Sequence, residues 1–187
     1  MGLWIVVAIV LFVLGSMMAL KPSGVDMRLD TLRMTARRLE LNPKLVACPD
    51  WVAGKDGEFG RGMIGQYGLV IDGIKLPHSR YRVIDGQWRP VSQVNTASKD
   101  NSDVSLSSVA PHYGLDKVEL ELPPAIQPFV KALTTQANSI ILYWEDIAYV
   151  RPVSNPHYRT ASVEPDLQLL KTKLNQWAQQ LQKSGRS

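Results

Sequence analysis

The feature that most restricts this chain is a long apolar run near its start. Leu3–Leu20 reads LWIVVAIVLFVLGSMMAL and contains no charged residue. As an α-helix this run would extend about 27 Å, close to the hydrocarbon thickness of a lipid bilayer. Trp4 near one end and Lys21-Pro22 at the other suit a segment that ends at the two membrane interfaces. The run therefore predicts a single transmembrane helix.

A cleaved signal peptide is the alternative explanation of the same run. It would require a basic stretch ahead of the apolar residues, where this sequence has only Met1-Gly2. A retained anchor is therefore favoured. Gly15 and Ala19 form a small-xxx-small pair, which would allow two such helices to approach closely, so a homo-oligomer is an alternative to a plain anchor. The residues expected to mark the anchor are Leu3, Trp4, Phe12, Gly15, Ala19 and Leu20.

Basic residues after the apolar run predict its orientation. No lysine or arginine precedes the run, and five follow closely: Lys21, Arg28, Arg33, Arg37 and Arg38. The positive-inside rule then places the N-terminus outside and the following domain in the cytoplasm. A periplasmic or lumenal domain is the opposite topology. The same five side chains are the expected contacts with anionic lipid head groups.

The remainder of the chain has the composition of a globular protein. The whole sequence has 187 residues, of which 45% are hydrophobic and 20% are charged. The part after the apolar run is therefore long enough for one domain with a hydrophobic core. The net charge of +4 is too small to indicate nucleic acid by itself. Cys48 is the only cysteine, which excludes an intramolecular disulfide, and it is expected to be a small buried hydrophobe.

Residues 23–42 are predicted to form a basic helix that follows the anchor of residues 1–22. Ser23 and Asp26 have the spacing of a capping box, and the helix should end at Leu41-Asn42-Pro43. It either rests on lipid or packs on the domain, and packing with some lipid contact is preferred. Its apolar residues recur every three or four positions, at Val25, Leu29, Leu32, Ala36 and Leu39.

Residues 43–187 are predicted to form one soluble α+β domain. A short strand at Leu45–Val52 leads to a glycine-rich hairpin loop at Gly54–Gly62, which lacks the GxxxxGKS/T spacing of a phosphate-binding loop. The tetrad Val-Ile-Asp-Gly then occurs twice, at 70–73 and 83–86. Asp-Gly between apolar runs is a strong hairpin signal. Two such turns predict a three-stranded β-meander near 64–71, 74–84 and 87–92.

The C-terminal half is predicted to contain two helices and a central strand. Gln93–Gly114 is polar and is expected to be a long surface loop. Pro123-Pro124 is expected to start a helix through Ala137, and Ser139–Trp144 is the most apolar strand of the domain. Pro165 opens a last helix, whose apolar stripe is Leu167, Leu170, Leu174, Trp177 and Leu181. An antiparallel sheet packed by two to three helices is the expected architecture.

Residues that could carry chemistry are few. The histidines His78, His112 and His157 have no HExxH or comparable ligand spacing. Glu145-Asp146 is the only carboxylate pair that follows a central strand, and adjacent residues of a strand point to opposite faces, so a catalytic dyad is not expected. Arg80 and Arg82 alternate with Tyr81 and Val83 along the strand. This alternation indicates a solvent-exposed face and a buried face rather than a nucleic-acid site. We therefore predict no enzyme activity, metal, cofactor or nucleic-acid partner.

The layout of the whole chain resembles a known group of proteins. The chain has an uncharged span that runs into Lys21-Pro22-Ser23, an arginine-rich helix, a hairpin with a tryptophan and a late Leu142-Tyr143-Trp144-Glu145. In this order of features it resembles single-span inner-membrane proteins of gammaproteobacteria that are often labelled YajC-like. YajC is a small accessory subunit of the preprotein translocase. The glycine-rich GD-x-V-x-T-x-GG element of YajC itself is missing here, so no site residue is carried over.

These observations predict a membrane-anchored, non-enzymatic interaction or accessory protein of a bacterial inner-membrane assembly. Its expected partners are the lipid bilayer and another inner-membrane protein. A peripheral module that binds anionic lipid is the first alternative, and a YajC-like translocase accessory factor is the second.

Overall fold

The computed structural model describes residues 2–19, 23–54, 57–91 and 114–185. Over these ranges the chain is an α+β protein with a six-stranded antiparallel sheet, which confirms the predicted α+β class and the antiparallel arrangement. The helices are α1 (Gly2–Ala19), α2 (Gly24–Arg38), α3 (Asp146–Val150) and α4 (Val163–Ser184), with 3₁₀ turns η2 (Gln127–Phe129) and η3 (Thr160–Ser162). The strands are β1 (Pro43–Ala47), β2 (Met63–Val70), β3 (Leu76–Ile84), β4 (Gln87–Pro90), β5 (Val130–Ala137) and β6 (Ser139–Trp144).

The strand order differs from the predicted β-meander. The order is β1-β2-β6-β5-β3-β4, so the β5–β6 hairpin lies between β2 and β3. The three strands expected near 64–71, 74–84 and 87–92 are present, but only β3 and β4 pair with each other. The meander is therefore wrong, although the predicted central position of Ser139–Trp144 is confirmed.

The two Val-Ile-Asp-Gly tetrads adopt different conformations. In the second, Asp85 and Gly86 both have positive φ, at 51° and 73°, as a tight β3–β4 hairpin turn requires. In the first, Gly73 has a φ of 74° but Asp72 is not in the left-handed region. The same four residues thus form a hairpin turn at 83–86 and part of a connection between separated strands at 70–73.

The segment expected to be a helix after Pro123 is instead the strand β5. Helical spacing of Ile126, Phe129, Val130 and Leu133 suggested the helix, but β5 lies between β6 and β3 and is buried over most of its length. A strand buried on both faces shows no alternation of apolar and polar residues, so its pattern resembles that of a buried helix. Thr134 and Thr135 are the β-branched residues that favour the strand.

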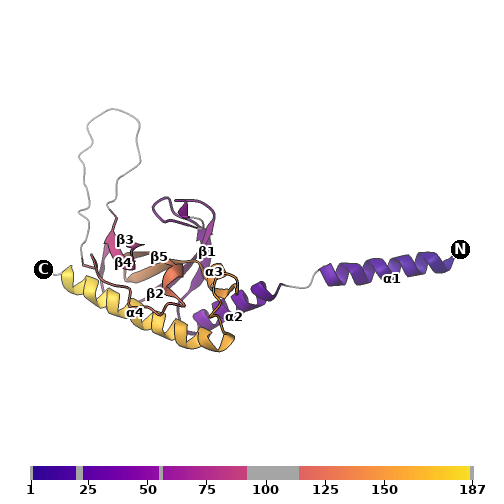
Figure 1. The fold of residues 1–187 in the computed structure, drawn as a ribbon. Coiled ribbons are helices and arrows are strands. Elements are labelled where there is room, and N and C mark those ends of the chain that lie inside the picture. Colours follow the sequence, from indigo (N-terminus) through magenta and orange to yellow (C-terminus); the bar gives the residue numbers. More distant parts are fainter. Residues whose placement is uncertain (1, 20–22, 55–56, 92–113, 186–187) are drawn as a thin grey trace, which may run out of the picture.

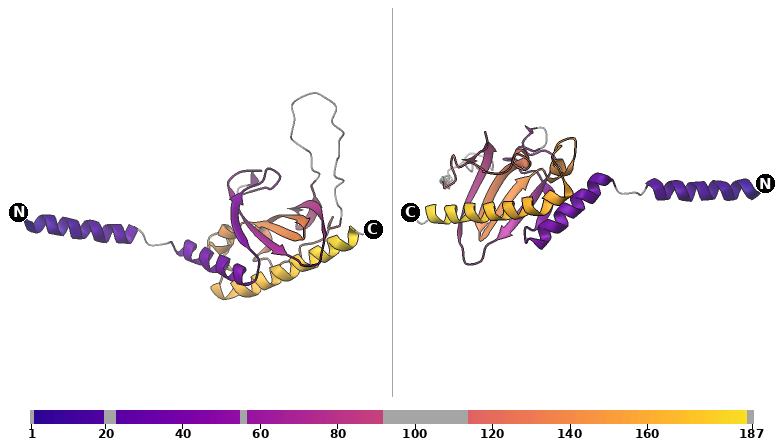
Figure 2. Two further views of the ribbon diagram at one scale, coloured as in Figure 1. Left: turned by 180° about the vertical axis from the view of Figure 1, so that it is seen from behind. Right: turned by 60° about the horizontal axis from the view of Figure 1, so that its bottom comes forward.

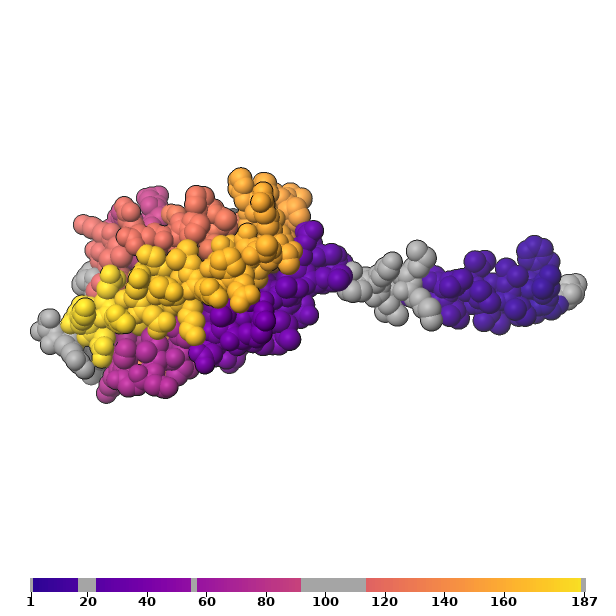
Figure 3. Space-filling view, turned by 90° about the horizontal axis from the view of Figure 1, so that it is seen from below, coloured from indigo at the N-terminus to yellow at the C-terminus, as the bar shows by residue number. Residues whose placement is uncertain are grey.

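The main core lies between the sheet and two helices. Helices α2 and α4 cover one face of the sheet, and the connection from β1 to β2 rises on the other (Figure 1). Figures 2 and 3 show α4 running alongside α2 across that covered face. The five apolar residues predicted for α4 are all buried, and Trp177 packs edge-on against Trp88 with ring centroids 5.1 Å apart.

Helix α2 has the predicted start and the predicted packing. The Ser23 hydroxyl accepts from the amide of Asp26, and the Asp26 carboxylate accepts from the Ser23 amide, which is the reciprocal capping box. Leu32 and Ala36 are buried in the core, and Val25, Leu29 and Leu39 pack against it. The last helical residue is Arg38, a few residues before the predicted end. Packing on the domain is thus confirmed for this helix.

Helix α1 stands apart from this core (Figure 1). Its described side chains are exposed as far as Ser16, including Leu3 at 76%, Trp4 at 79% and Phe12 at 77%. Within the ranges that the structure describes, no helix is long and apolar enough to cross a membrane. The predicted transmembrane helix at Leu3–Leu20 is therefore not supported as a span, although the helix is present. Leu20 and Lys21 lie outside the described residues.

Two predicted loops lie wholly or partly outside the described ranges. Residues 92–113, which include most of the polar loop expected at 93–114 and His112, lie outside them. The glycine-rich segment at 54–62 connects the paired strands β1 and β2, as a hairpin loop was predicted to do, and residues 55 and 56 lie outside the described part. Cys48 is buried at 5% exposure, which confirms its prediction as a small core residue.

Candidate functional site

The sheet face opposite the helices gathers arginines and aromatic rings. Arg80 and Arg82 belong to β3, two residues apart, and therefore point to the same face. Trp51 and Phe59 reach them from the β1–β2 connection, and Arg89 lies directly across from Arg82 on β4. We call these five residues, Trp51, Phe59, Arg80, Arg82 and Arg89, the basic–aromatic face.

The β1–β2 connection is held in place by a small second core. Cys48, Val52 and Ile64 are buried there together with Ala132 and Tyr143 of the neighbouring strands. The connection also folds closely on itself, because a Cβ atom at Gly60, whose φ is 69°, would lie 2.8 Å from the Asp50 carboxylate. This packing fixes the positions from which Trp51 and Phe59 extend.

Both aromatic rings lie against guanidinium groups. The Cζ atom of Arg80 is 5.4 Å from the centre of the Trp51 ring, and that of Arg82 is 5.2 Å from the centre of the Phe59 ring. Trp51 also meets Tyr143 edge-on at 5.6 Å. Arg89 makes a long ion pair of 3.5 Å with Asp116, whereas neither Arg80 nor Arg82 forms an ion pair with a described residue. The face is thus rich in positive charge, and the described residues compensate little of it.

A second polar cluster lies inside the domain, at the junction of α2, β2 and α3. The Asp146 carboxylate, 1% exposed, accepts hydrogen bonds from Nε and Nη2 of Arg33 at 2.9 and 2.8 Å. The Tyr67 hydroxyl donates to the same oxygen at 3.4 Å. Gly65 makes room for the carboxylate, because a Cβ atom there would lie 2.8 Å from it.

Burial controls the electrostatics of this cluster. Burial raises the pKa of the Asp146 carboxyl, and the hydrogen bonds and charge of Arg33 oppose that rise. Burial also raises the pKa of the Tyr67 hydroxyl, and the nearby Asp146 carboxylate adds to the effect. The cluster therefore joins α2 to the sheet through a paired carboxylate. The polar groups of Arg33, Tyr67 and Asp146 form hydrogen bonds with one another.

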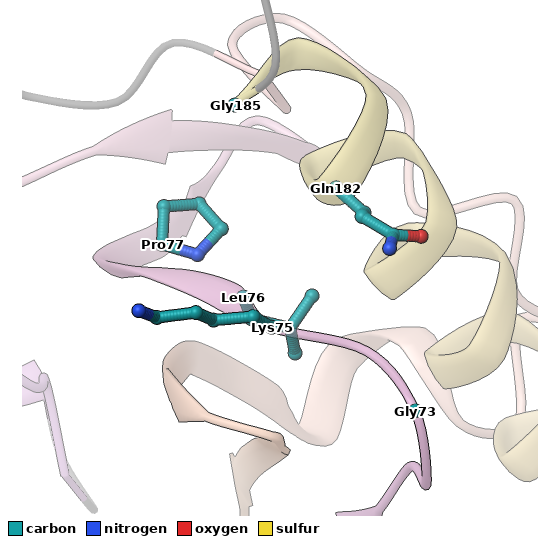
Figure 4. Close-up of a pocket in the computed structure, with 6 residues that line it drawn as sticks. All are labelled: Gly73, Lys75, Leu76, Pro77, Gln182 and Gly185. Carbon is teal, nitrogen blue, oxygen red and sulfur yellow. The ribbon is translucent and has the colours of Figure 1, made fainter.

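The surface pockets bring few reactive side chains together. One of about 460 Å³ is lined mainly by apolar residues, and Glu145, Asp146 and Arg151 are its charged lining residues. Another of about 410 Å³ lies between the start of β3 and the end of α4, where Lys75 and Gln182 extend in opposite directions (Figure 4). Among the described residues, no group of three or more histidine, cysteine, aspartate or glutamate side chains could hold a metal ion.

The arginines predicted to contact lipid occupy different environments. Arg37 and Arg38 are exposed near the end of α2. Arg28 is partly buried, with its Cζ atom 5.7 Å from the centre of the Tyr158 ring. Arg33, only 21% exposed, is committed to Asp146. Lipid contact by these residues stays a prediction, and Arg33 has a structural partner that the sequence did not indicate.

Sequence reasoning missed the pairing of Arg33 with Asp146, which are 113 positions apart. Glu145-Asp146 was predicted to follow the strand Ser139–Trp144, and strand geometry was applied to the two side chains. The strand ends at Trp144, as predicted, but Asp146 is the first residue of α3, so its side chain does not have the orientation of a strand residue. A buried carboxylate requires a nearby cation, and no local spacing identified which of several arginines supplied it.

No protein-family model, curated protein or solved structure matches this chain. The resemblance to YajC-like proteins therefore stays a prediction.

Proposed function

We propose that this chain is a membrane-tethered binding protein. In this proposal α1 inserts into a lipid bilayer, and the α+β domain binds a partner protein at the membrane without catalysing a reaction. The membrane is the bacterial inner membrane, with the N-terminus outside and the domain in the cytoplasm. The observation that carries the proposal is that an apolar helix, α1, is exposed along all of its described side chains.

Exposed apolar surface on this scale is costly in water. Every described side chain of α1 as far as Ser16 is exposed, and the sequence of the helix contains no charged residue. Large apolar patches of this kind mark sites that contact lipid or protein. Removal of such side chains from water contributes about 25 cal/mol per Å² of apolar surface. A lipid bilayer can surround the helix on all sides, as its uniform apolar character requires.

The folded domain offers a surface for a partner protein. Helices α2 and α4 cover one face of the sheet, which leaves the basic–aromatic face as the face without helices. Aromatic and arginine side chains are enriched among the residues that dominate protein interfaces. This composition supports a binding role better than a catalytic one.

Membrane fractionation tests the proposal. The full chain should remain in the membrane pellet after alkaline carbonate treatment and should dissolve only in detergent. Val7→Asp combined with Leu11→Asp should release it, because each aspartate costs roughly 2.5–3.5 kcal/mol in a bilayer. Gln179→Asp with Gln180→Asp, on the exposed side of α4, is the matched control. Release of the unmodified chain by carbonate would disprove insertion.

The exposed pair Arg37 and Arg38 favours one second candidate, a peripheral module that binds anionic lipid. Arg37→Gln with Arg38→Gln should then weaken binding to phosphatidylglycerol vesicles when α1 carries the two aspartates named above. Arg33 does not belong in this test, because its substitution would also unpair Asp146. Unchanged vesicle binding would exclude this candidate and leave the membrane tether unaffected.

A further inference from the structure

We propose that the basic–aromatic face binds an extended acidic segment of a partner protein, in which carboxylates on alternate residues pair with Arg80 and Arg82. This inference rests on the proposed binding function and specifies its partner. It does not depend on insertion of α1 into lipid.

The first argument is the incomplete pairing of the two arginines. Among the described residues of the domain, six other basic side chains form ion pairs: Arg33, Arg61, Arg89, Lys131, Lys171 and Lys173. Arg80 and Arg82 are partly buried and form none with described residues. The Nε atom of Arg82 is buried and has no acceptor among the described residues. Partly desolvated guanidinium groups gain more from an added anion than fully solvated ones.

The second argument is the spacing and orientation of the two groups. Residues two apart on a strand lie about 6.6 Å apart on one face, and alternate residues of an extended peptide have the same spacing. Trp51 and Phe59 lie against the guanidinium groups, which restricts their motion before a ligand arrives. A restricted guanidinium is suited to two parallel hydrogen bonds with one carboxylate.

The third argument is charge repulsion across the β3–β4 pair. Arg82 and Arg89 occupy directly opposite positions in the register, where like charges destabilise a sheet. Among the described residues, the one ion pair at this place is the long one between Arg89 and Asp116. An anionic ligand would offset a repulsion that the described residues leave uncompensated.

The ring of Phe59 favours a peptide over a bare phosphate. This side chain is 54% exposed beside Arg82, so it presents apolar surface next to the charge. A peptide can cover that surface with the side chain or backbone between two carboxylates. A phosphate ion has no group that would contact it.

Fluorescence anisotropy of the full chain in neutral detergent tests the inference. The probe is a fluorescein-labelled peptide of alternating serine and glutamate, and the reference peptide carries glutamine in place of glutamate. Arg80→Gln with Arg82→Gln should weaken probe binding at least tenfold. Arg37→Gln with Arg38→Gln removes the same charge from exposed positions of α2 and should change binding less than twofold. Circular dichroism spectra that match the unmodified chain establish that each variant is folded.

Three results would overturn the inference. The first is equal binding of the glutamate and glutamine peptides, and the second is equal loss in the two arginine pairs. The third is displacement of the probe by inorganic phosphate or short-chain phosphatidylglycerol combined with insensitivity to glutamate spacing, which would assign the face to phosphate groups. Tighter binding of alternating glutamates than of glutamates at every third residue would support it. Fractionation of the same chain reports on the membrane tether separately.

Discussion

Asp146 shows how much one side chain contributes to the arrangement of this fold. Its carboxylate receives Arg33 from α2 and Tyr67 from β2, and the residue itself opens α3. A buried charge of this kind is tolerated because its partner supplies two hydrogen bonds. The cluster therefore contributes to the position of α2 on the domain, in addition to the apolar contacts of that helix.

Removal of the cation at this cluster should produce a pH-dependent loss of stability. Arg33→Met leaves the Asp146 carboxylate unpaired and should cost about 3–5 kcal/mol near neutral pH. Burial already raises the pKa of Asp146, and loss of Arg33 raises it further. A group with a raised folded-state pKa favours folding below its unfolded pKa and penalises it as pH rises through the folded pKa.

The difference in unfolding free energy between Arg33→Met and the unmodified chain should therefore shrink on acidification toward about pH 4, near the unfolded pKa of aspartate. Urea unfolding of both proteins at neutral pH and at about pH 4 measures this difference in unfolding free energy. Arg37→Met, which changes an exposed arginine of the same helix, should show no such pH dependence. A constant loss for Arg33→Met would mean that its charge does not act through Asp146.

The glycines of β2 provide a matched test of the space around Asp146. A Cβ atom at Gly65 would lie within 2.8 Å of the carboxylate, whereas one at Gly68 would meet only Ile141, at 3.8 Å. Gly65→Ala should therefore destabilise the domain by about 1–3 kcal/mol, as overpacking does. Gly68→Ala should be neutral or stabilise it by up to about 1 kcal/mol. Thermal unfolding of both variants decides the matter, and equal effects would contradict the close approach.

At the scale of elements, α4 is the principal cover of the sheet. Its buried residues follow the helical stripe from Val163 to Leu181, and Trp177 contacts Trp88 of β4. This contact connects the last helix to the edge strand at the end of the strand order. The helix thus closes the core over strands that come from distant parts of the chain.

Trp177→Ala should be among the most damaging substitutions in this helix. We expect a loss of about 3–5 kcal/mol, because it removes a large buried side chain and leaves a cavity against Trp88. Gln179→Ala, on the exposed side of α4, should change stability by less than about 0.5 kcal/mol. Denaturant unfolding compares the two, and similar values would show that the stripe does not pack as described.

Elements with a strong local signal were predictable from sequence, and elements defined by distant neighbours were not. The helical stripe of α4 and the capping box of α2 are local patterns, and both were identified. The strand β5 was taken for a helix because burial on both faces removed its alternation. The first Val-Ile-Asp-Gly tetrad was taken for a hairpin because nothing local indicated that β5 and β6 would separate β2 from β3.

The basic–aromatic face was predictable only in part. Alternation along β3 indicated that Arg80 and Arg82 share a face, and the structure confirms this arrangement. The contacts of Trp51 and Phe59 with these arginines were not predictable, because they depend on how the β1–β2 connection folds over the sheet. Pairing over such separations leaves no periodic trace in the sequence.

At the scale of the whole molecule, the described residues of α1 share no core with the domain. The residues of both core clusters, and those packed against them, all come from position 25 onward. Burial within the described part of the chain therefore assigns α1 no share in the stability of the domain.

Deletion of residues 1–22 should accordingly leave the domain folded. Its unfolding temperature should change by less than about 2 °C, since the described residues of the deleted segment contribute no buried side chain. The shortened chain should also appear in the soluble fraction after cell lysis. Differential scanning calorimetry in the same detergent compares both forms. A large fall in unfolding temperature would show that α1 contributes to the core after all.

The strand order also has a consequence during synthesis. Strands β2 and β3 leave the ribosome early, but each pairs with the β5–β6 hairpin, which ends at Trp144. Until that hairpin emerges, the nascent chain carries unpaired strand edges that can associate with other chains. Formation of the central sheet is thus delayed until about three quarters of the 187 residues exist. Nascent chains arrested before residue 130 should remain sensitive to protease, and those extended past residue 184 should become resistant.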